Sequence, residues 1–327
     1  MSYYINYPKW LSPFVFPFTT IIRWYSLMYL FAFATAFFLL RHILKYDQSR
    51  LKLSIKDEKD VELVLYVAVF LIIGARLGSC LIYSGTYYYK HPLEIFFPFK
   101  NGKFVGLGGM SYHGGIFGAL LGGLIFSKVH KVKLVDVIDT LIVCIPFGYT
   151  WGRIGNFLNR ELYGRVTTSS LGMMFPPENT ELFDSSLPWV RDVMAKVGIE
   201  SNAPFVNLPR YPSQLYEAFF EGIVIGCIMW FVIRPHLKKM MPLMPFGVYL
   251  TLHGLVRFFI EYLREPDSNL GFIIKGGAGS DTPYLFTSIL NISMGQILCL
   301  IMVLSGVLIM FLSKMMYNKS RGKECRK

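Results

Sequence analysis

WGRIGNFLNRELYGR, residues Trp151–Arg165, follows the apolar run Leu134–Tyr149 and begins where that run meets a polar segment. Its polar side chains include Arg153, Asn156, Asn159, Glu161 and Arg165, and its glycines are Gly152, Gly155 and Gly164. Polar groups at the boundary of a membrane are costly, so they indicate function by default. The stretch therefore predicts a membrane protein with a site for an anionic substrate at this position.

The composition predicts a chain that crosses a membrane. Hydrophobic residues make up 53% of the 327 residues, and the mean hydropathy is +0.43. Seven apolar runs have about the length that spans a bilayer, roughly 17 to 25 residues. They lie near residues 21–40, 62–84, 110–127, 134–151, 217–233, 243–262 and 292–312. We expect an all-α integral membrane protein in which residues 1–327 form one membrane domain, a seven-span helical bundle.

Segments between these runs predict structure at the membrane surface. Residues 152–216 form the longest loop and are expected to make a small external head segment. Residues 85–109 are rich in Tyr, Phe and Pro, which is too apolar for an ordinary exposed loop. Aromatic rings favour the headgroup region of a bilayer. We therefore expect residues 85–109, and the aromatic residues among 1–20, to lie as interfacial arms on the outer surface.

The net charge of +12 is explained by membrane orientation, and nucleic acid is not expected as a partner. Segments 41–61, 128–133, 234–242 and 313–327 hold 18 Lys and Arg in 51 residues, whereas the alternate segments hold 12 in 139. Loops rich in Lys and Arg stay in the cytoplasm. The N-terminus is then outside and the C-terminus is cytoplasmic.

Glycine spacing predicts close approach to a neighbouring helix at two places. Gly114, Gly118 and Gly122 follow one another at four-residue intervals and would form a smooth helix face, and Gly74 and Gly78 show the same spacing. His113 stands at the outer start of the first of these helices. A lone histidine is more often structural than catalytic, but its glycine, serine and tyrosine neighbours favour a functional role, and both interpretations remain open.

A second charged stretch lies at the end of the sixth run. Arg257 and Glu261 are four residues apart and can pair on one helix face, which Arg264 also shares. Two arginines with one glutamate leave positive charge that an anion could use. Arginine suits phosphate because its planar donors bind two oxygens together. Arg153 and Asn156 share a face in the same way, so the arginine segments, with Arg76 as a further candidate, predict a phospholipid substrate.

His113 and Glu161 are the candidates for proton transfer near this site. The six histidines lack metal-ligand spacing and no Cys-x-x-Cys pair is present, so neither a metal nor a cofactor is expected. Glu217, which enters the fifth run, is either a helix-end carboxylate or a partner for an arginine.

Five motifs together resemble those of the prolipoprotein diacylglyceryl transferase family, and they occur in the family's order over nearly the whole chain. They are RWYSLMY at 23–29, GMSYHGG at 109–115, GRIGNFLNRELYG at 152–164, PSQLYE at 212–217 and RFFIEYLREPD at 257–267. Members of that family have seven spans with the N-terminus outside. The resemblance thus agrees with the orientation taken from the charges.

The resemblance implies an enzyme of the bacterial cytoplasmic (inner) membrane that catalyses the first step of lipoprotein maturation. The diacylglyceryl group of phosphatidylglycerol would pass to the lipobox cysteine thiol of a preprolipoprotein, forming a thioether and releasing glycerol-1-phosphate. By resemblance Arg153 and Arg257 hold the phosphate, and His113 is a candidate base. Residues expected to build and orient the site are Tyr25, Asn156, Glu161, Gly164, Glu261 and Arg264.

Two positions depart from the family pattern, and two other functions compete. Tyr211 and His253 stand where many members have His and Tyr, respectively, and His253 would bring an imidazole near Arg257. An anion or lipid transporter would also use arginines within the membrane, but it predicts internal repeats, which the sequence lacks. A membrane scaffold with structural ion pairs does not explain why polar residues gather at the outer ends of the runs.

Overall fold

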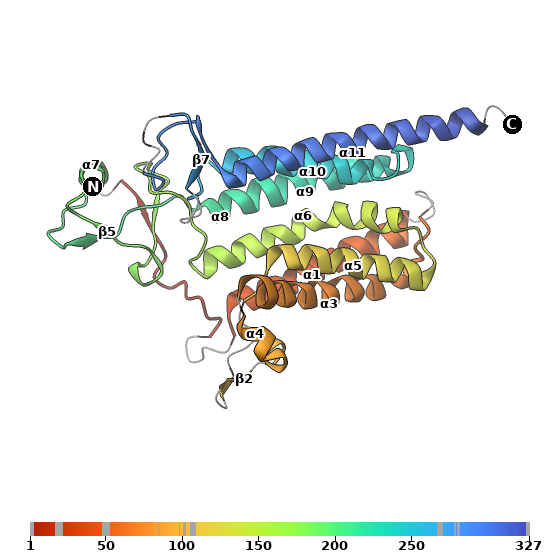
Figure 1. The fold of residues 1–327 in the computed structure, drawn as a ribbon, viewed down its shortest axis with the longest axis horizontal. Helices are drawn as coiled ribbons and strands as arrows, with labels where there is room; N and C mark the ends of the chain where they lie inside the picture. The colour runs from red at the N-terminus through yellow and green to blue at the C-terminus, as the bar shows by residue number, and fades with distance from the viewer. Residues whose placement is uncertain are drawn as a thin grey trace. The chain divides into compact units, whose positions relative to one another are not determined.

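The computed structural model describes residues 3–16, 22–47, 53–84, 86–97, 99–100, 103–104, 109–266, 271–277, 279 and 282–324. The chain is mostly helical (Figure 1). Its α-helices are α1 (Trp24–His42), α3 (Asp60–Gly78), α4 (Tyr87–Lys90), α5 (Tyr112–His130), α6 (Leu134–Leu158), α7 (Pro188–Val197), α8 (Ser213–Tyr216), α9 (Ile225–Cys227), α10 (Met244–Ile260) and α11 (Met294–Glu324). The strands are β1 (Ile5–Asn6), β2 (Phe99–Lys100), β3 (Lys103–Phe104), β4 (Met173–Met174), β5 (Phe183–Asp184), β6 (Phe205–Val206), β7 (Phe272–Lys275) and β8 (Asn291–Ser293).

The long helices confirm a multi-pass membrane protein. Among the residues that the structure describes, five helical segments are long and apolar enough to cross a bilayer, by length and composition. They are Trp24–Asp47, Asp60–Ile82, Leu134–Leu158, Ser213–Leu237 and Met294–Lys319. The other two predicted spans coincide with α5 and with α10, which is a shorter apolar helix of 17 residues. A total of seven spans therefore stays a prediction.

Two helix ends differ from the predicted ones in a way that matters for the site. The predicted fourth span ended at residue 151, but α6 continues to Leu158. The helix thus includes Arg153 and Asn156, which were assigned to the head loop. The predicted fifth span began at residue 217, but the helix begins at Ser213. Its π-helical segments Glu217–Val224 and Ile228–Ile233 join α8 and α9 into one helix, named here the α8–α9 helix. Polar side chains do not end a helix when neighbouring side chains satisfy them.

The described chain forms two compact units. Unit 1 is Met1–Thr35, Ile142–His236 and Leu243–Lys327, and unit 2 is Ala36–Leu141 and Leu237–Pro242. Within unit 2, α3 and α5 lie side by side (Figure 1). A Cβ atom at Gly118 would lie 2.0 Å from the Phe70 carbonyl oxygen, and one at Gly74 would lie 2.4 Å from that of Gly114. The two backbones touch, which confirms the close contact predicted from glycine spacing.

Arg76 is buried in unit 2 and ties the predicted arm of residues 85–109 to α3. Its guanidinium donates to the backbone oxygens of Ile95, Glu94 and Gly109. Large apolar side chains of this arm face outward, with Leu93 89% and Phe97 59% exposed. Exposed apolar groups suit a membrane surface, and the interfacial position of the arm stays a prediction.

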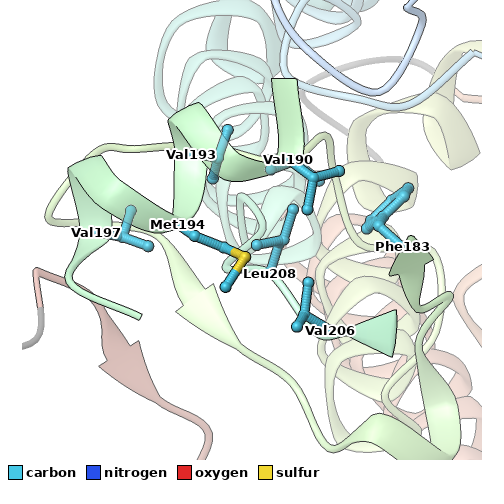
Figure 2. Packing of buried hydrophobic residues seen from close by; sticks show 8 residues of the cluster. Phe183, Val190, Val193, Met194, Val197, Val206 and Leu208 are labelled. Carbon is cyan, nitrogen blue, oxygen red and sulfur yellow. The ribbon is translucent and has the colours of Figure 1, made fainter. Parts of the chain in front are cut away.

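The predicted external head, residues 152–216, begins inside α6 and ends inside the α8–α9 helix, and its external position stays a prediction. Residues 159–212, between the two helices, hold small pieces of β structure and one amphipathic helix. β5 pairs antiparallel with β6, and β1 pairs parallel with β4. Helix α7 buries one apolar face against the strands. Figure 2 shows the side chains that meet there. They are Phe183, Val190, Val193, Met194, Val197, Val206 and Leu208. The prediction of an all-α protein thus holds for the long helices, while short strands supply the head and the β7–β8 hairpin.

Candidate functional site

A buried carboxylate joins three arginines within unit 1. Oε2 of Glu217 lies 2.9 Å from Nε of Arg153 and 2.8 Å from Nη1 of Arg257. Its other oxygen, Oε1, accepts a hydrogen bond of 2.9 Å from Nη1 of Arg264. The side chain of Glu217 is 0% exposed. Glu217 is thus the partner of three arginines, and the helix-end alternative is wrong.

Glu221 supplies a second buried carboxylate one turn further along the α8–α9 helix. Tyr149 donates a hydrogen bond of 2.5 Å from its hydroxyl to Oε2 of Glu221 and accepts one of 2.7 Å from Nε of Arg153. Oε1 of Glu221 lies 3.5 Å from Nη1 of Arg257. Nε2 of His253 lies 3.7 Å from Oε2. The histidine that departs from the family pattern therefore faces a carboxylate.

Glu261 completes the set. Its Oε2 lies 3.3 Å from Nη2 of Arg257 and 3.5 Å from Nε of Arg264, which confirms the predicted pairing at four-residue spacing. These residues are named here the arginine–glutamate cluster. Its members are Arg153, Glu217, Glu221, Arg257, Glu261 and Arg264. Arg257 and Arg264 share Glu261 as predicted, but three arginines meet three glutamates, so the prediction that positive charge is left over is wrong. Glu217 and Glu221 supply the carboxylates that it left out.

Small residues and one turn bring these side chains together. A Cβ atom at Gly222 would lie 2.0 Å from Oγ1 of Thr150, so glycine lets the α8–α9 helix approach α6 closely. A turn after α10 returns the chain, because the Arg264 amide donates to the Glu261 carbonyl. The turn places Arg264 on the same side as Arg257. The arginine–glutamate cluster thus forms where α6, the α8–α9 helix, α10 and the turn after α10 meet.

The arginine side chains of the cluster are more exposed than the carboxylates of Glu217 and Glu221. Side chains of Arg153, Arg257 and Arg264 are each 17% exposed, whereas those of Glu217 and Glu221 are 0% exposed. Each guanidinium has five N–H donors, more than these contacts use. The carboxylates hold the guanidinium groups in place, and N–H donors that these contacts do not use could bind an anion. A phosphate with several oxygens fits such donors best.

Most of the predicted site residues lie in or beside this cluster. Nη1 of Arg153 donates to Oδ1 of Asn156 at 3.3 Å, which confirms their shared face. Nδ2 of Asn156 donates to Oε1 of Glu161 at 2.9 Å. The Tyr25 ring packs on Gly155, two residues after Arg153, and its hydroxyl lies 3.3 Å from that of Tyr29. Asn156, Glu161 and Tyr25 therefore extend the polar surface along the C-terminal end of α6.

Gly164 allows two backbone segments to lie in close contact. A Cβ atom there would lie 2.2 Å from the Leu263 carbonyl oxygen, and its amide donates to Tyr211 at 2.8 Å. Glycine thus lets the strand after α6 run against the turn that carries Arg264. His113 belongs to unit 2, at the exposed start of α5, so it is not one of the residues that unit 1 brings together. Its role stays a prediction.

Two further arginines brace the head behind this turn. Arg165 donates to the backbone oxygens of Arg264 and Leu285, and burial lowers its pKa to about 10. Arg210 pairs with Glu265, next to Arg264. Burial raises the pKa of Glu265, and the neighbouring Arg210 guanidinium opposes that rise. Arg165, the last residue of the polar stretch 151–165, therefore does not join the cluster but holds the backbone of the turn that carries Arg264.

Sequence reasoning missed Glu221 and Tyr149, and a signal for each was present. Glu221 lies four residues after Glu217 in an apolar helix, a spacing that places two carboxylates on one face. Tyr149 lies four residues before Arg153 in the same way. Neither spacing names a partner on another helix. In the part of the chain that the structure describes, no group of three or more His, Cys, Asp or Glu could hold a metal ion.

The fold and the site define a multi-pass membrane protein with donors for an anion held among its helices. Comparison with known families is consistent with that class. The family model described as prolipoprotein diacylglyceryl transferase matches residues 13–312, and the chain belongs to this family.

Relatives named phosphatidylglycerol–prolipoprotein diacylglyceryl transferase match nearly the full chain. One from Treponema denticola is 42% identical over 334 residues, covering 98% of this chain and 97% of its own length. Another from Treponema pallidum is 40% identical over 332 residues, covering 98% and 99%. A third from Chlorobaculum tepidum is 37% identical over 318 residues, covering 96% and 93%.

Proposed function

We propose that the protein transfers the diacylglyceryl group of phosphatidylglycerol to the lipobox cysteine of preprolipoproteins, the first step of lipoprotein maturation. The observation that carries this proposal is the set of three arginines whose side chains are each 17% exposed while the Glu217 carboxylate that joins them is 0% exposed. Family membership supplies the donor and the acceptor, because the relatives are named for both.

The chemistry is a displacement at the glyceryl carbon that bears the phosphate ester. The cysteine sulfur attacks this carbon, the C–S bond forms, and the C–O bond to the phosphate breaks. Glycerol-1-phosphate leaves with the bonding electron pair. The thiol proton passes to a base or to water, since the thiolate is the nucleophile. The step needs no oxidant, metal or cofactor.

Arg153 and Arg257 are assigned to the phosphate, whose negative charge increases as the C–O bond breaks. Donors that are fixed before the reaction stabilise such charge most effectively. Glu261 and Arg264 keep Arg257 in place, and Asn156 joins Arg153 to Glu161. His113 and Glu161 are the proposed proton acceptors. Tyr25 and Gly164 complete the surface on which the lipid and the peptide are oriented.

The test uses the full-length protein in mixed micelles with phosphatidylglycerol and a lipobox peptide. The peptide should gain the mass of one diacylglyceryl group, with one glycerol phosphate released for each thioether. Arg153→Ala and Arg257→Ala should each lower kcat/KM by about a thousandfold, because two charge-assisted contacts to the phosphate are lost with each. Arg191→Ala, at an exposed arginine of the head, is the matched control. Normal thioether formation by the two site variants would refute the assignment.

We further propose seven spans in the bacterial inner membrane, with the N-terminus and the head outside and the C-terminus cytoplasmic. The charge distribution along the sequence supports this orientation. Two single cysteine variants test this orientation: Ser201→Cys, at a position in the head, and Lys319→Cys, at a position near the end of α11. A membrane-impermeant maleimide should label Ser201→Cys in spheroplasts and Lys319→Cys only after lysis. Labelling in the reverse order would refute the orientation.

A further inference from the structure

We infer that Tyr149 and Glu221 are positioning residues that fix the spacing of Arg153 and Arg257 for the phosphate of the lipid. This inference rests on the proposed function and goes beyond it. Tyr149 and Glu221 are not proposed to bind the substrate themselves. They act through the guanidinium groups, which they contact at the same nitrogens as Glu217 does, Nε of Arg153 and Nη1 of Arg257.

Glu217 by itself leaves the two arginines free to turn. Arg153 and Arg257 both contact the same oxygen, Oε2, at 2.9 and 2.8 Å. Two groups that share a single acceptor atom can pivot about it, so this contact fixes how near they lie but not how their planes face. An anion that bridges two guanidinium groups needs both the distance and the planes.

Tyr149 and Glu221 close a ring through a second path. Arg153 donates to the Tyr149 hydroxyl at 2.7 Å, and that hydroxyl donates to Glu221 at 2.5 Å. The other oxygen of Glu221 lies 3.5 Å from Arg257. The ring therefore runs through Arg153, Tyr149, Glu221, Arg257 and Glu217. The ring meets each guanidinium at the nitrogen that Glu217 also contacts, so it fixes the spacing of these two nitrogens through a second path.

Packing around the phenol makes the second path stiff. The Arg153 guanidinium carbon lies 4.7 Å from the centre of the Tyr149 ring, a cation–π contact that holds the guanidinium over the ring. His253 meets the same ring edge-on at 5.4 Å and is itself stacked on Tyr249 at 5.4 Å. Glu221 is 0% exposed, so water does not compete for its oxygens. The phenol is thus enclosed by its neighbours on several sides.

The test compares Tyr149→Phe, Glu221→Gln and the double variant in the micelle assay. Each single change should raise the KM for phosphatidylglycerol and lower kcat/KM by about tenfold to a hundredfold, because small misplacement of a binding group has effects of this size. The KM for the peptide should stay unchanged. The kcat/KM of the double variant should be no lower than that of the less active single variant, since either change opens the same ring.

Tyr284→Phe is the matched control, because Tyr284 also donates to a glutamate, Glu181, at 3.4 Å in the head. It should leave both KM values as in the wild type. A merely structural role for Tyr149 and Glu221 would lower the yield of active enzyme and the maximal rate while leaving both KM values unchanged. That result, or wild-type kinetics in both variants, would overturn the inference.

A binding measurement separates this inference from the proposed function. Phosphatidylglycerol should raise the apparent Tm of the wild type in neutral detergent more than diacylglycerol does, and Tyr149→Phe and Glu221→Gln should each reduce that rise. A wild type that binds the lipid but transfers nothing would refute the proposed function alone. An undiminished rise in both variants would refute the inference alone.

Discussion

The α3–α5 pair and the arginine–glutamate cluster hold helices together by opposite means. Between α3 and α5 the backbones touch at glycines, so the contact depends on side chains that are absent. In the cluster, long charged side chains from α6, the α8–α9 helix and α10 meet around Glu217. The first contact tolerates no added atom, whereas the second tolerates no lost charge. The difference predicts that an added side-chain atom destabilises the α3–α5 contact, whereas loss of a charged group destabilises the arginine–glutamate cluster.

Removal of the central carboxylate should have the largest effect. Glu217→Gln keeps the shape of the side chain but leaves three arginines without their common partner. Breaking a buried ion pair in this way costs about 3–5 kcal/mol. We expect a marked fall in the apparent Tm of the purified protein and loss of transfer activity. Glu181→Gln, at an exposed glutamate of the head, should leave both unchanged. An unaltered Tm in Glu217→Gln would mean that the cluster does not stabilise the fold.

A single added methyl group should separate α3 from α5. In Gly118→Ala the new Cβ would lie 2.0 Å from the Phe70 carbonyl oxygen, so one backbone must move. Overpacking of this kind costs about 1–3 kcal/mol.

Gly123→Ala is the control on the same helix, because its Cβ would meet Val137 at an ordinary 3.5 Å. The apparent Tm should fall for Gly118→Ala and stay level or rise slightly for Gly123→Ala, since alanine favours a helix. Equal Tm values would show that the glycine contact is unimportant.

The smallest expected effect concerns pH at Glu265, beside the cluster. Burial raises the pKa of its folded state above the unfolded value of about 4.3. The contribution of Glu265 to stability is therefore full below the unfolded pKa and is lost as pH rises through the folded pKa. The Tm of the wild type minus that of Glu265→Gln should be larger at pH 5 than at pH 8, by about a few degrees at most. A smaller difference at pH 5 would contradict the sign.

Residues that are near in sequence could be paired from spacing alone. Arg257 with Glu261, Arg153 with Asn156, and the glycines of α5 all have the contacts that helical spacing predicts. The seven apolar runs each coincide with a helix, but several helices continue into polar residues beyond the predicted ends, as α6, the α8–α9 helix and α11 do. The partners of Glu217 could not be predicted, because Arg153 precedes it by 64 residues and Arg264 follows it by 47.

The sequence by itself determined that the chain crosses a membrane and which family it resembles, and it supplied the arginines that are proposed to hold the phosphate. Those properties follow from composition, hydropathy and local motifs, which need no knowledge of distant contacts. Only the tertiary structure decided that three buried glutamates balance the three arginines, and that the Tyr149 hydroxyl joins Arg153 to Glu221. Charges within a bilayer must be paired wherever the fold brings partners together, and the pairing depends on how helices from separate parts of the chain pack.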